Sequence, residues 1–380
     1  ILMAQDKDQK TLNVPPLRFP GFTDKWKEST IGNVVKIGNG RDYKHLGNGS
    51  IPVFGTGGYM TSVDDYLYDG ETVFIGRKGS IDKPFYFSGK FWTVDTLFYT
   101  YDFNGVIPKF LYSIFQRINW KKYNEASGVP SLSKATIEKI KFKYPLSPEQ
   151  DKISRLLSLI DERIATQNKI IEDLKKLKSA ISAQLYEGHY ITDNSNGWKI
   201  VRLGDITENF SIRNKNSGSY PMYSVTNTSG FSPQHEVFEG KEIKDEDISI
   251  YKIIHKGEFA YNPARINVGS IGRYDGEAPC MISSLYVCFR PTAEVDSDWL
   301  LYYLQSAKKI YQYGIFGEGG VRIYLFYPNF SRIEALLPPL KVQKEIASIL
   351  KSFNRKIKLD ELLLSKYQEQ KKFLLSNMFI

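Results

Sequence analysis

The chain of 380 residues carries 51 basic and 42 acidic side chains, and its formal net charge of +9 favours a polyanionic partner such as nucleic acid. This length exceeds what one ordinary core needs, so two or more domains are expected. The two cysteines are too few for a disulfide framework and do not form a Cys-x-x-Cys pair, and with only four histidines a zinc site is not expected. No apolar run approaches the roughly 20 residues that span a membrane.

The first part of the chain is predicted to be a polar leader without a signal peptide, residues 1–14, followed by a globular domain, residues 15–147. Short stretches rich in Val, Ile, Phe, Tyr and Thr, separated by glycines, predict strands at 51–55, 72–76, 84–87 and 96–101. Residues 26–35 are predicted to form a short strand or a turn of helix. A helix is expected from Ile107 to Asn119, with Pro108 in its first turn.

A long helix is predicted at 148–187, because apolar residues recur there at alternating spacings of four and three. This spacing is typical of a coiled-coil seam, formed here by Ile153, Leu157, Ile160, Ile164, Ile171, Leu174, Ile181 and Leu185. Gln167 and Lys178 interrupt the seam. The expected end signals are a capping box at the start and a glycine after the end, supplied by Ser147, Pro148, Gln150 and Gly188.

The whole plan then occurs a second time, as a globular domain at 188–340 and a long helix at 341–380. The second seam consists of Ile346, Leu350, Phe353, Ile357, Leu364, Tyr367, Leu374 and Met378. Its interruptions recur in place, since Asp360 corresponds to Gln167 and Lys371 to Lys178, which indicates a duplicated unit. The expected fold class is α+β: two mixed α/β domains joined by two long antiparallel coiled-coil helices, with a pseudo-twofold internal repeat.

The sequence offers no catalytic motif. The glycines at 54–58 resemble the loop that cradles S-adenosylmethionine, but no Asn/Asp-Pro-Pro-aromatic tetrapeptide accompanies them, and a turn between strands is the simpler interpretation. No P-loop and no Ser/His/Asp arrangement is present. The pair Glu242-x-Lys244 could form part of a nuclease site, but it sits in a charge run, and such runs are usually solvated surface. No catalytic residue and no metal ligand is therefore predicted.

Basic and polar loops that follow the predicted strands are the candidate DNA-binding elements, and they recur in both copies. Arg and Lys can pair with guanine, Asn with adenine, and Ser with phosphate. The candidate residues are Arg41, Tyr43, Lys44, Arg77, Lys78, Ser80, Ser131, Lys134, Arg213, Asn214, Lys215, Arg265, Asn267, Arg273, Arg322 and Tyr324. Solvated turns are the alternative. The second domain is net acidic, so DNA binding there requires an acidic outer face, such as 236–247, and basic loops turned toward the DNA.

The lead-ins to both helices share the pattern Pro-x-x-x-x-Gln-x-x-Ile, at 145–153 and 338–346, and the opening stretch 17–22 has the sequence Leu-Arg-Phe-Pro-Gly-Phe. Together with the ordered duplication, these residues resemble the specificity subunit of type I restriction–modification enzymes over nearly the whole chain. The second lead-in departs from the first, because Leu-Lys-Val replaces Ser-Pro-Glu and leaves the start of its helix less defined.

The resemblance implies two target-recognition domains, each recognising one half of a bipartite, asymmetric DNA site, and helices that set the spacing and dock two modification subunits. Those partners would bring S-adenosylmethionine and methylate adenine, and restriction subunits would add ATP and Mg²⁺, so this chain would be non-catalytic and bind no cofactor itself. The complex would act in the cytoplasm of a bacterium or archaeon. Two alternatives stay open: a DNA-binding protein that acts alone or is the recognition part of a fused methyltransferase or nuclease, and a coiled-coil adaptor without a DNA role.

Overall fold

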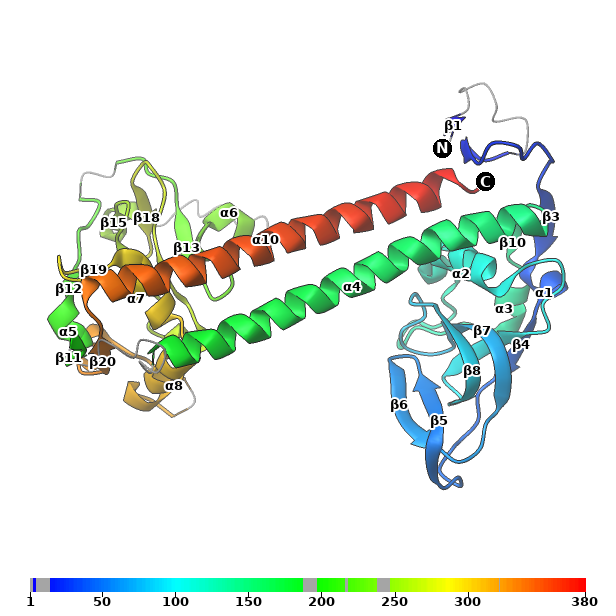
Figure 1. Ribbon diagram of the computed structural model, residues 1–380, viewed down its shortest axis with the longest axis horizontal. Helices are drawn as coiled ribbons and strands as arrows, with labels where there is room; N and C mark the ends of the chain where they lie inside the picture. Colours follow the sequence, from blue (N-terminus) through cyan, green and yellow to red (C-terminus); the bar gives the residue numbers. More distant parts are fainter. Residues whose placement is uncertain (1–2, 5–13, 187–196, 216–217, 238–246, 321) are drawn as a thin grey trace. The chain divides into compact units, whose positions relative to one another are not determined.

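The computed structural model describes residues 3–4, 14–186, 197–215, 218–237, 247–320 and 322–380 (Figure 1). The chain folds as two compact units: unit 1 comprises Ile1–Asn168 with Leu362–Ile380, and unit 2 comprises Lys169–Glu361. The helices α4 (Ser147–Tyr186) and α10 (Leu340–Asn377) each contribute to both units. The boundaries of the compact units therefore differ from those of the five consecutive segments predicted from the sequence, because each unit includes part of α4 and part of α10.

Unit 1 is built around a six-stranded sheet. Its neighbouring strands are antiparallel, except that β5 and β8 run parallel. In spatial order the strands are β4 (Lys36–Asn39), β9 (Leu97–Tyr101), β7 (Tyr68–Gly76), β8 (Phe85–Thr93), β5 (Asn48–Gly55) and β6 (Gly58–Val63). All four predicted strands are present, three of them longer than predicted, whereas β4 and β6 were not predicted.

The helix α2 (Pro108–Arg117) packs its apolar face on this sheet, and its Phe110, Leu111 and Phe115 are fully buried. Residues 26–35 contain both predicted alternatives in succession, the strand β3 and the one-turn helix α1. The remaining elements of unit 1 are β1 (Met3–Ala4), β2 (Leu17–Arg18), β3 (Lys27–Thr30), α1 (Ile31–Val34), η2 (Trp120–Tyr123), α3 (Lys134–Glu138) and β10 (Lys141–Tyr144).

Unit 2 has a smaller sheet and two separate ribbons in place of the six-stranded sheet. The antiparallel sheet has the order β12 (Thr207–Phe210), β19 (Val287–Pro291), β16 (Phe259–Tyr261) and β17 (Ile271–Arg273). The ribbons pair β13 (Tyr223–Thr226) with β14 (Gly230–Pro233), and β15 (Lys252–Ile254) with β18 (Cys280–Ile282). The helices are α5 (Leu203–Ile206), α6 (Gln234–Val237), η4 (Ile248–Ile250), η5 (Ile266–Val268), α7 (Ser297–Leu304), α8 (Ala307–Phe316) and α9 (Tyr327–Phe330).

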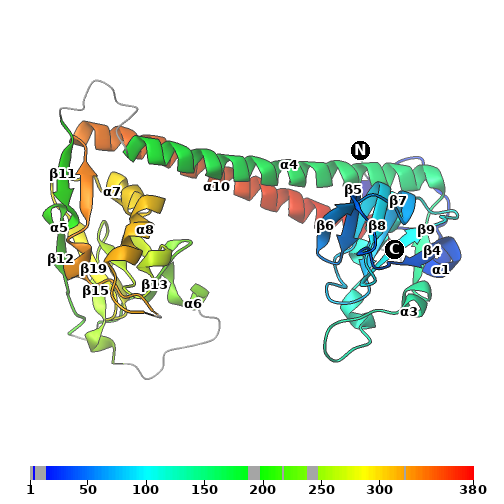
Figure 2. The same cartoon turned by 90° about the horizontal axis from the view of Figure 1, so that it is seen from below.

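Both units nevertheless share one frame. A two-stranded ladder joins β3 to β10 in unit 1, and the corresponding ladder in unit 2 joins β11 (Lys199–Arg202) to β20 (Glu334–Leu337). All four strands are labelled in Figure 1, and Figure 2 shows β11 from a second side. The Ile31 amide donates to Ile140 O at 3.0 Å, and the Leu203 amide donates to Ile333 O at 2.9 Å, at matching positions. The duplication inferred from the helices thus extends to the globular parts.

The two long helices run antiparallel within each unit. In unit 1 the amino-terminal half of α4, through Ile153 and Leu157, shares a core with Leu374 near the end of α10 and with Met378 just after it. In unit 2 the carboxyl-terminal half of α4 shares a core with the beginning of α10. The fold class predicted from the sequence is confirmed. Every predicted seam position is buried or half-buried, including Ile160, Ile164, Ile171, Leu174, Ile181, Leu185, Ile346, Leu350, Phe353, Ile357, Leu364 and Tyr367.

The glutamine of each helix lead-in ties its helix to the globular part. Gln150 Nε2 donates to Pro145 O and Gly105 O, and its Oε1 accepts from the Ile107 amide, at 2.8–2.9 Å. The predicted capping box was therefore wrong: Ser147 already lies inside α4, and Gln150 Oε1 accepts from the Ile107 amide before α2 instead of from a backbone amide at the start of its own helix. The predicted stop signal, Gly188, lies outside the described residues.

Gln343 repeats these bonds at the start of α10. Its Nε2 donates to Pro338 O at 2.8 Å and Glu294 O at 3.2 Å, and its Oε1 accepts from the Asp296 amide at 2.7 Å. Asp296 is the N-cap of α7, as Ile107 is of α2. The glutamine shared by the lead-ins is thus a duplicated structural anchor.

A buried ion pair distinguishes the two lead-ins. The Arg18 guanidinium contacts both carboxylate oxygens of Glu149, at 2.7 and 2.8 Å, and both side chains are almost fully buried. The residue at the corresponding position of α10 is Val342, which is also buried. An apolar contact therefore replaces the ion pair in unit 2, which explains how α10 begins without the Ser-Pro-Glu sequence.

Candidate nucleic-acid interface

Three loops of unit 1 meet beside the turn between β8 and β9. The amides of Arg77 and Lys78, at the end of β7, donate to Thr96 O at 2.8 and 3.2 Å. The Arg41 amide, after β4, donates to Thr93 O at 2.8 Å. Backbone bonds therefore place three of the predicted DNA-binding residues in one group of loops, which we call the unit 1 loop cluster.

The segment before α3 adds a further candidate to this cluster. Lys78 and Ser131 form an isolated antiparallel bridge, and the Leu132 amide donates to Arg77 O at 2.9 Å. Leu132 is buried, whereas Lys78 is exposed and Ser131 is half-buried. The buried leucine thus anchors a loop whose neighbours face solvent, where a phosphate or base edge could be contacted.

A left-handed glycine shapes the cluster and recurs in unit 2. Gly79 has φ +85° and Gly269 has φ +96°, in the region that side chains other than glycine rarely adopt. In both copies the amide two residues later turns back to the glycine carbonyl, from Ile81 at 2.9 Å and from Ile271 at 2.8 Å. The predicted correspondence of these two loops is therefore also a conformational one.

The other candidates of unit 1 have local partners. Tyr43 is half-buried and packs against the cluster that contains Val53 and Trp92. Lys134 is exposed, with Glu138 at 3.7 Å in an ion pair that costs little to break at the surface. Lys44 is exposed and Ser80 is half-buried. Lys44 and Lys134 are therefore accessible to a ligand, whereas Tyr43 has a packing role.

Unit 2 has an equivalent loop pair. The Leu325 amide donates to Pro263 O at 2.9 Å, which repeats the bond between Leu132 and Arg77 in unit 1. This bond brings the segment before α9 beside the loop that carries Arg265 and Asn267, of which Arg265 is exposed and Asn267 half-buried.

The same segment carries an exposed aromatic pair. The rings of Tyr324 and Phe326 are nearly parallel, with centroids 6.2 Å apart and an interplanar angle of 9°. Their side chains are 37% and 51% exposed, and Arg322 beside them is exposed. Aromatic faces next to a cation suit stacking and phosphate contact with nucleic acid. Phe326 was not among the residues predicted from the sequence.

Two predicted residues have structural roles instead. Asn214 is 2% exposed, and its side-chain amide exchanges hydrogen bonds with the Gly218 backbone at 2.8 and 2.9 Å. Arg273 is paired with Asp275 at 2.6 Å and Asp298 at 2.7 Å, and its side chain is only 15% exposed. In both residues the polar groups that a base contact would need already have partners inside the unit, so the structure does not favour their predicted role in DNA binding.

Arg213 and Lys215 are the chain neighbours of Asn214, and both are exposed. Arg213 forms an isolated antiparallel bridge with Lys252 of β15. These two cations thus lie beside the β15–β18 ribbon, while Arg265 lies in the loop before β17.

Sequence reasoning also missed an exposed pair next to the unit 1 loop cluster. A Cβ atom added to Gly79 would lie 3.7 Å from Thr56 Oγ1, so the turn between β5 and β6 borders the cluster. Tyr59 and Met60, just after this turn, are 64% and 51% exposed. Large apolar side chains directly after a glycine turn were the available signal, and such side chains stack on bases or wedge between them.

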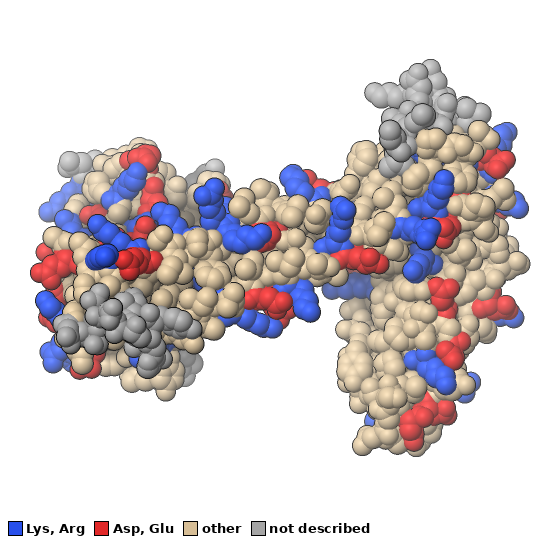
Figure 3. All heavy atoms as spheres, viewed as in Figure 1, with Lys and Arg blue, Asp and Glu red and all other residues tan. Residues whose placement is uncertain are grey.

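On the face of the molecule drawn in Figure 3, charge does not mark an interface. On the face drawn in Figure 3, Lys and Arg side chains are interspersed with Asp and Glu over both units. The charge run at 236–247 lies largely outside the described residues, so the predicted acidic outer face has no structural description. The candidate interface therefore depends on loop geometry.

The thiols of unit 2 are unsuited to catalysis. Cys280 and Cys288 are buried in the core between the ribbons and the sheet, and burial raises the pKa of each to about 12. Such thiols are protonated and unreactive at neutral pH. Within the described ranges, no group of three His, Cys, Asp or Glu side chains could hold a metal ion, and no helix is long and apolar enough to cross a membrane.

Known proteins share this sequence and architecture. A specificity subunit of a type I restriction enzyme from Haemophilus influenzae is 26% identical over 326 residues, which cover 80% of either chain. The MjaVIII specificity subunit of Methanocaldococcus jannaschii is 23% identical over 77% of this chain and 72% of its own. Among solved structures, the S subunit of the M. genitalium type I restriction–modification system is similar in fold, with a TM-score of 0.65 at 17% identity over 97% of this chain and 99% of its own.

A second solved chain, from a study of assembly and conformational transition in the type I restriction–modification system, has a TM-score of 0.52 at 14% identity and covers 93% of this chain and 97% of its own. The family described as the type I restriction modification DNA specificity domain matches residues 23–176 and 195–366. These two matches coincide with the two copies of the duplicated frame. The chain therefore belongs to the type I restriction modification DNA specificity domain family.

Proposed function

We propose that this protein is the DNA-recognition subunit of a type I restriction–modification complex and that its two globular parts recognise the two halves of a bipartite site. The observation that carries the proposal is that the two copies share one backbone frame but differ in the sheets built on it. Both copies have the same ladder, the same glutamine anchor and the same left-handed glycine, but a six-stranded sheet fills one and a four-stranded sheet with ribbons fills the other. Unlike loops on a common frame suit an asymmetric target.

The partners follow from this role. Modification subunits that bind the paired helices would supply S-adenosylmethionine and methylate adenine, and restriction subunits would supply ATP and Mg²⁺. Exposed apolar residues on α4 and α10 support a docking role for these helices, since Leu159, Leu177, Leu359 and Leu362 are each at least half exposed.

The proposal is tested by charge reversal in the unit 1 loop cluster. The double variant Arg77→Glu, Lys78→Glu removes two cations that contact the DNA and places two acids beside it. Adenine methylation is mapped in a host that carries the chain with its modification subunits. We expect wild type to methylate one bipartite motif, and the variant to lose the sequence requirement, or the methylation, at one half-site.

The matched control is Lys25→Glu, Lys27→Glu, which reverses two exposed cations at the β3–β10 ladder. It is expected to keep the wild-type motif. An unchanged motif in the loop variant would contradict DNA recognition by this cluster. Methylation by the chain in the absence of modification subunits would instead favour a methyltransferase or a fused enzyme.

A further inference from the structure

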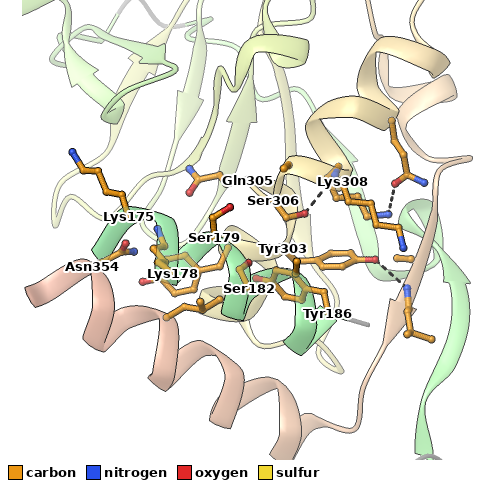
Figure 4. Close-up of a pocket in the computed structure, with 18 of the residues that line it drawn as sticks. Lys175, Lys178, Ser179, Ser182, Tyr186, Tyr303, Gln305, Ser306, Lys308 and Asn354 are labelled. Carbon is orange, nitrogen blue, oxygen red and sulfur yellow. Dashed lines mark hydrogen bonds between the residues drawn. The ribbon is translucent and has the colours of Figure 1, made fainter. Parts of the chain in front are cut away.

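Unit 2 contains a cavity of about 700 Å³ beside the helix pair. Its walls come from α4, α7, α8, α10 and β20. Figure 4 shows Lys178, Ser179 and Ser182 of α4 on one side, and Gln305, Ser306 and Lys308 on the other. The cavity is of the size that small ligands occupy in proteins.

The cavity wall is strongly cationic. Four lysines line it, Lys175 and Lys178 from α4 and Lys308 and Lys309 from α8, and the only lining carboxylate among the described residues is that of the exposed Glu334. Lys175 is paired with Glu361 at 2.7 Å, which leaves Lys178, Lys308 and Lys309 as the cations of the cavity. Lys309 is 1% exposed and donates to Gln312 Oε1 and to the Glu334 carbonyl. Because Lys309 is held beneath the surface, it contributes positive charge to the cavity without a carboxylate partner of its own.

The duplication provides an internal comparison. Unit 1 has a cavity of about 810 Å³ at the corresponding place, beside α2 and the other halves of both helices. There Lys371 forms an ion pair with Asp161. The positions corresponding to Lys371 and Asp161 in unit 2 are Lys178 and Asn354, and both line the unit 2 cavity. One repeat therefore balances the lysine with a carboxylate, and the other has an amide in place of that acid.

Lys178 consequently keeps an unbalanced charge. No ion pair of Lys178 occurs in the part of the chain that the structure describes, and burial lowers its pKa. Hydrogen-bond donors accompany it: Ser179, Ser182 and Ser306 line the same cavity. The Tyr186 hydroxyl, in the same wall, is buried and has no hydrogen-bond partner among the described residues.

We propose that the unit 2 cavity binds a phosphate group, held by Lys178 and Lys308 together with hydroxyl donors of the cavity wall. The beginning of α8, where Ser306 is the N-cap, adds backbone amides and the positive end of a helix dipole. Lysine ammonium groups are strong phosphate ligands. A bound anion would balance the charge of Lys178, as Asp161 balances the charge of Lys371 in unit 1. This site is separate from the loops assigned to DNA recognition and does not depend on that assignment.

Calorimetric titration of the full chain with inorganic pyrophosphate, in a buffer free of other polyanions, tests the site. Wild type is expected to bind. The variant Asn354→Asp places a carboxylate where Asp161 stands in unit 1, so it should pair with Lys178 and weaken pyrophosphate binding at least about tenfold. Since asparagine and aspartate have the same shape, the fold is expected to persist, which circular dichroism verifies.

The matched control is Asn354→Ala, which removes the amide without adding charge and should bind within about threefold of wild type. Equal losses in the two variants would overturn the charge argument, and so would wild type that does not bind pyrophosphate. A hexaglutamate peptide that binds in place of pyrophosphate, with the same sensitivity to Asn354→Asp, would overturn the assignment to phosphate.

The source of the phosphate is decided by competition. If a DNA duplex abolishes pyrophosphate binding, the cavity receives a backbone phosphate of the DNA. If pyrophosphate binds equally well to the chain with and without duplex, the ligand is a free phosphorylated compound. Both results support a phosphate site, and they are independent of whether the Arg77 and Lys78 variant alters half-site recognition.

Discussion

At the scale of single residues, the glutamine of each lead-in has a structural role that the sequence alone does not reveal. Gln150 satisfies two carbonyls and one amide in a buried position, and it is 0% exposed. Replacing it by methionine keeps the volume but leaves these three backbone groups without partners. We expect Gln150→Met to lower the free energy of unfolding of unit 1 by about 2–4 kcal/mol.

Urea unfolding combined with hydrogen exchange measures this effect separately for the two units. The control is Gln368→Met, at an exposed position of α10, which should change stability by less than about 0.5 kcal/mol. Gln343→Met should repeat the loss in unit 2, because its bonds are the same. If the Gln150 and Gln368 variants are equally stable, the anchor role is excluded.

The two thiols of unit 2 allow a second residue-scale prediction. Burial raises the pKa of Cys280 and of Cys288 to about 12, so at pH 8 the native chain holds very little thiolate. We expect no reaction with a thiol reagent such as DTNB at pH 8 in native protein, and reaction of two thiols per chain after unfolding. Rapid labelling of the native chain would show that the core around these residues opens.

At the scale of elements, the end of α10 and the residues that follow it are part of the core of unit 1. The Phe379 ring packs against Phe110 and Trp26, with centroids 5.4 and 6.1 Å away, and the Arg117 guanidinium lies 4.9 Å from its centre. We expect Phe379→Ala to destabilise unit 1 by about 3–5 kcal/mol, because it leaves a cavity among buried rings.

The exposed Phe373, in the last turns of α10, provides the control for this variant. Its side chain is 58% exposed, so Phe373→Ala should have little effect on the stability of unit 1. Hydrogen exchange of the unit 1 peptides distinguishes the two variants. Equal protection in both would mean that the carboxyl terminus does not contribute to this core.

The elements that the sequence predicted best are those with a long period. A seam of ten positions identifies α4 and α10, because the alternating spacing of four and three recurs along the whole helix. The sheets were harder to predict. In unit 1, Gly70 and Gly89 interrupt the strand patterns of β7 and β8, yet they face each other across the ladder, and the ring of Tyr68 lies over Gly70. Only tertiary pairing reveals that such glycines are inside strands.

Prediction from local sequence is limited in the same way at the candidate interface. Arg77 and Lys78 were found because a strand, a basic pair and a glycine follow one another in the chain. Asn214 and Arg273 were also predicted from local sequence, but the Gly218 backbone bonds the amide of Asn214 and Asp298 forms an ion pair with Arg273. Residue type and spacing thus identify candidate loops, whereas only the folded chain identifies which side chains remain available to a ligand.

At the scale of the whole molecule, the proposed function makes the helix length a determinant of the DNA site. Both α4 and α10 pass from one unit into the other. Inserting one heptad in each helix, after Gln167 and after Asp360, keeps the seam in register and adds about 10 Å of helix. At about 3.4 Å per base pair, the gap between the half-sites should then grow by about three base pairs.

The methylated motif of the variant measures this gap directly. The two half-site sequences are expected to stay unchanged, because the loops that recognise them are untouched, and only the number of unspecified bases between them should rise. A heptad inserted in α4 alone is the control, since it leaves the two seams unequal in length and should abolish methylation. If the paired insertion methylates the original motif with its original gap, the helices do not set the spacing, and recognition by two units held at a fixed separation is refuted.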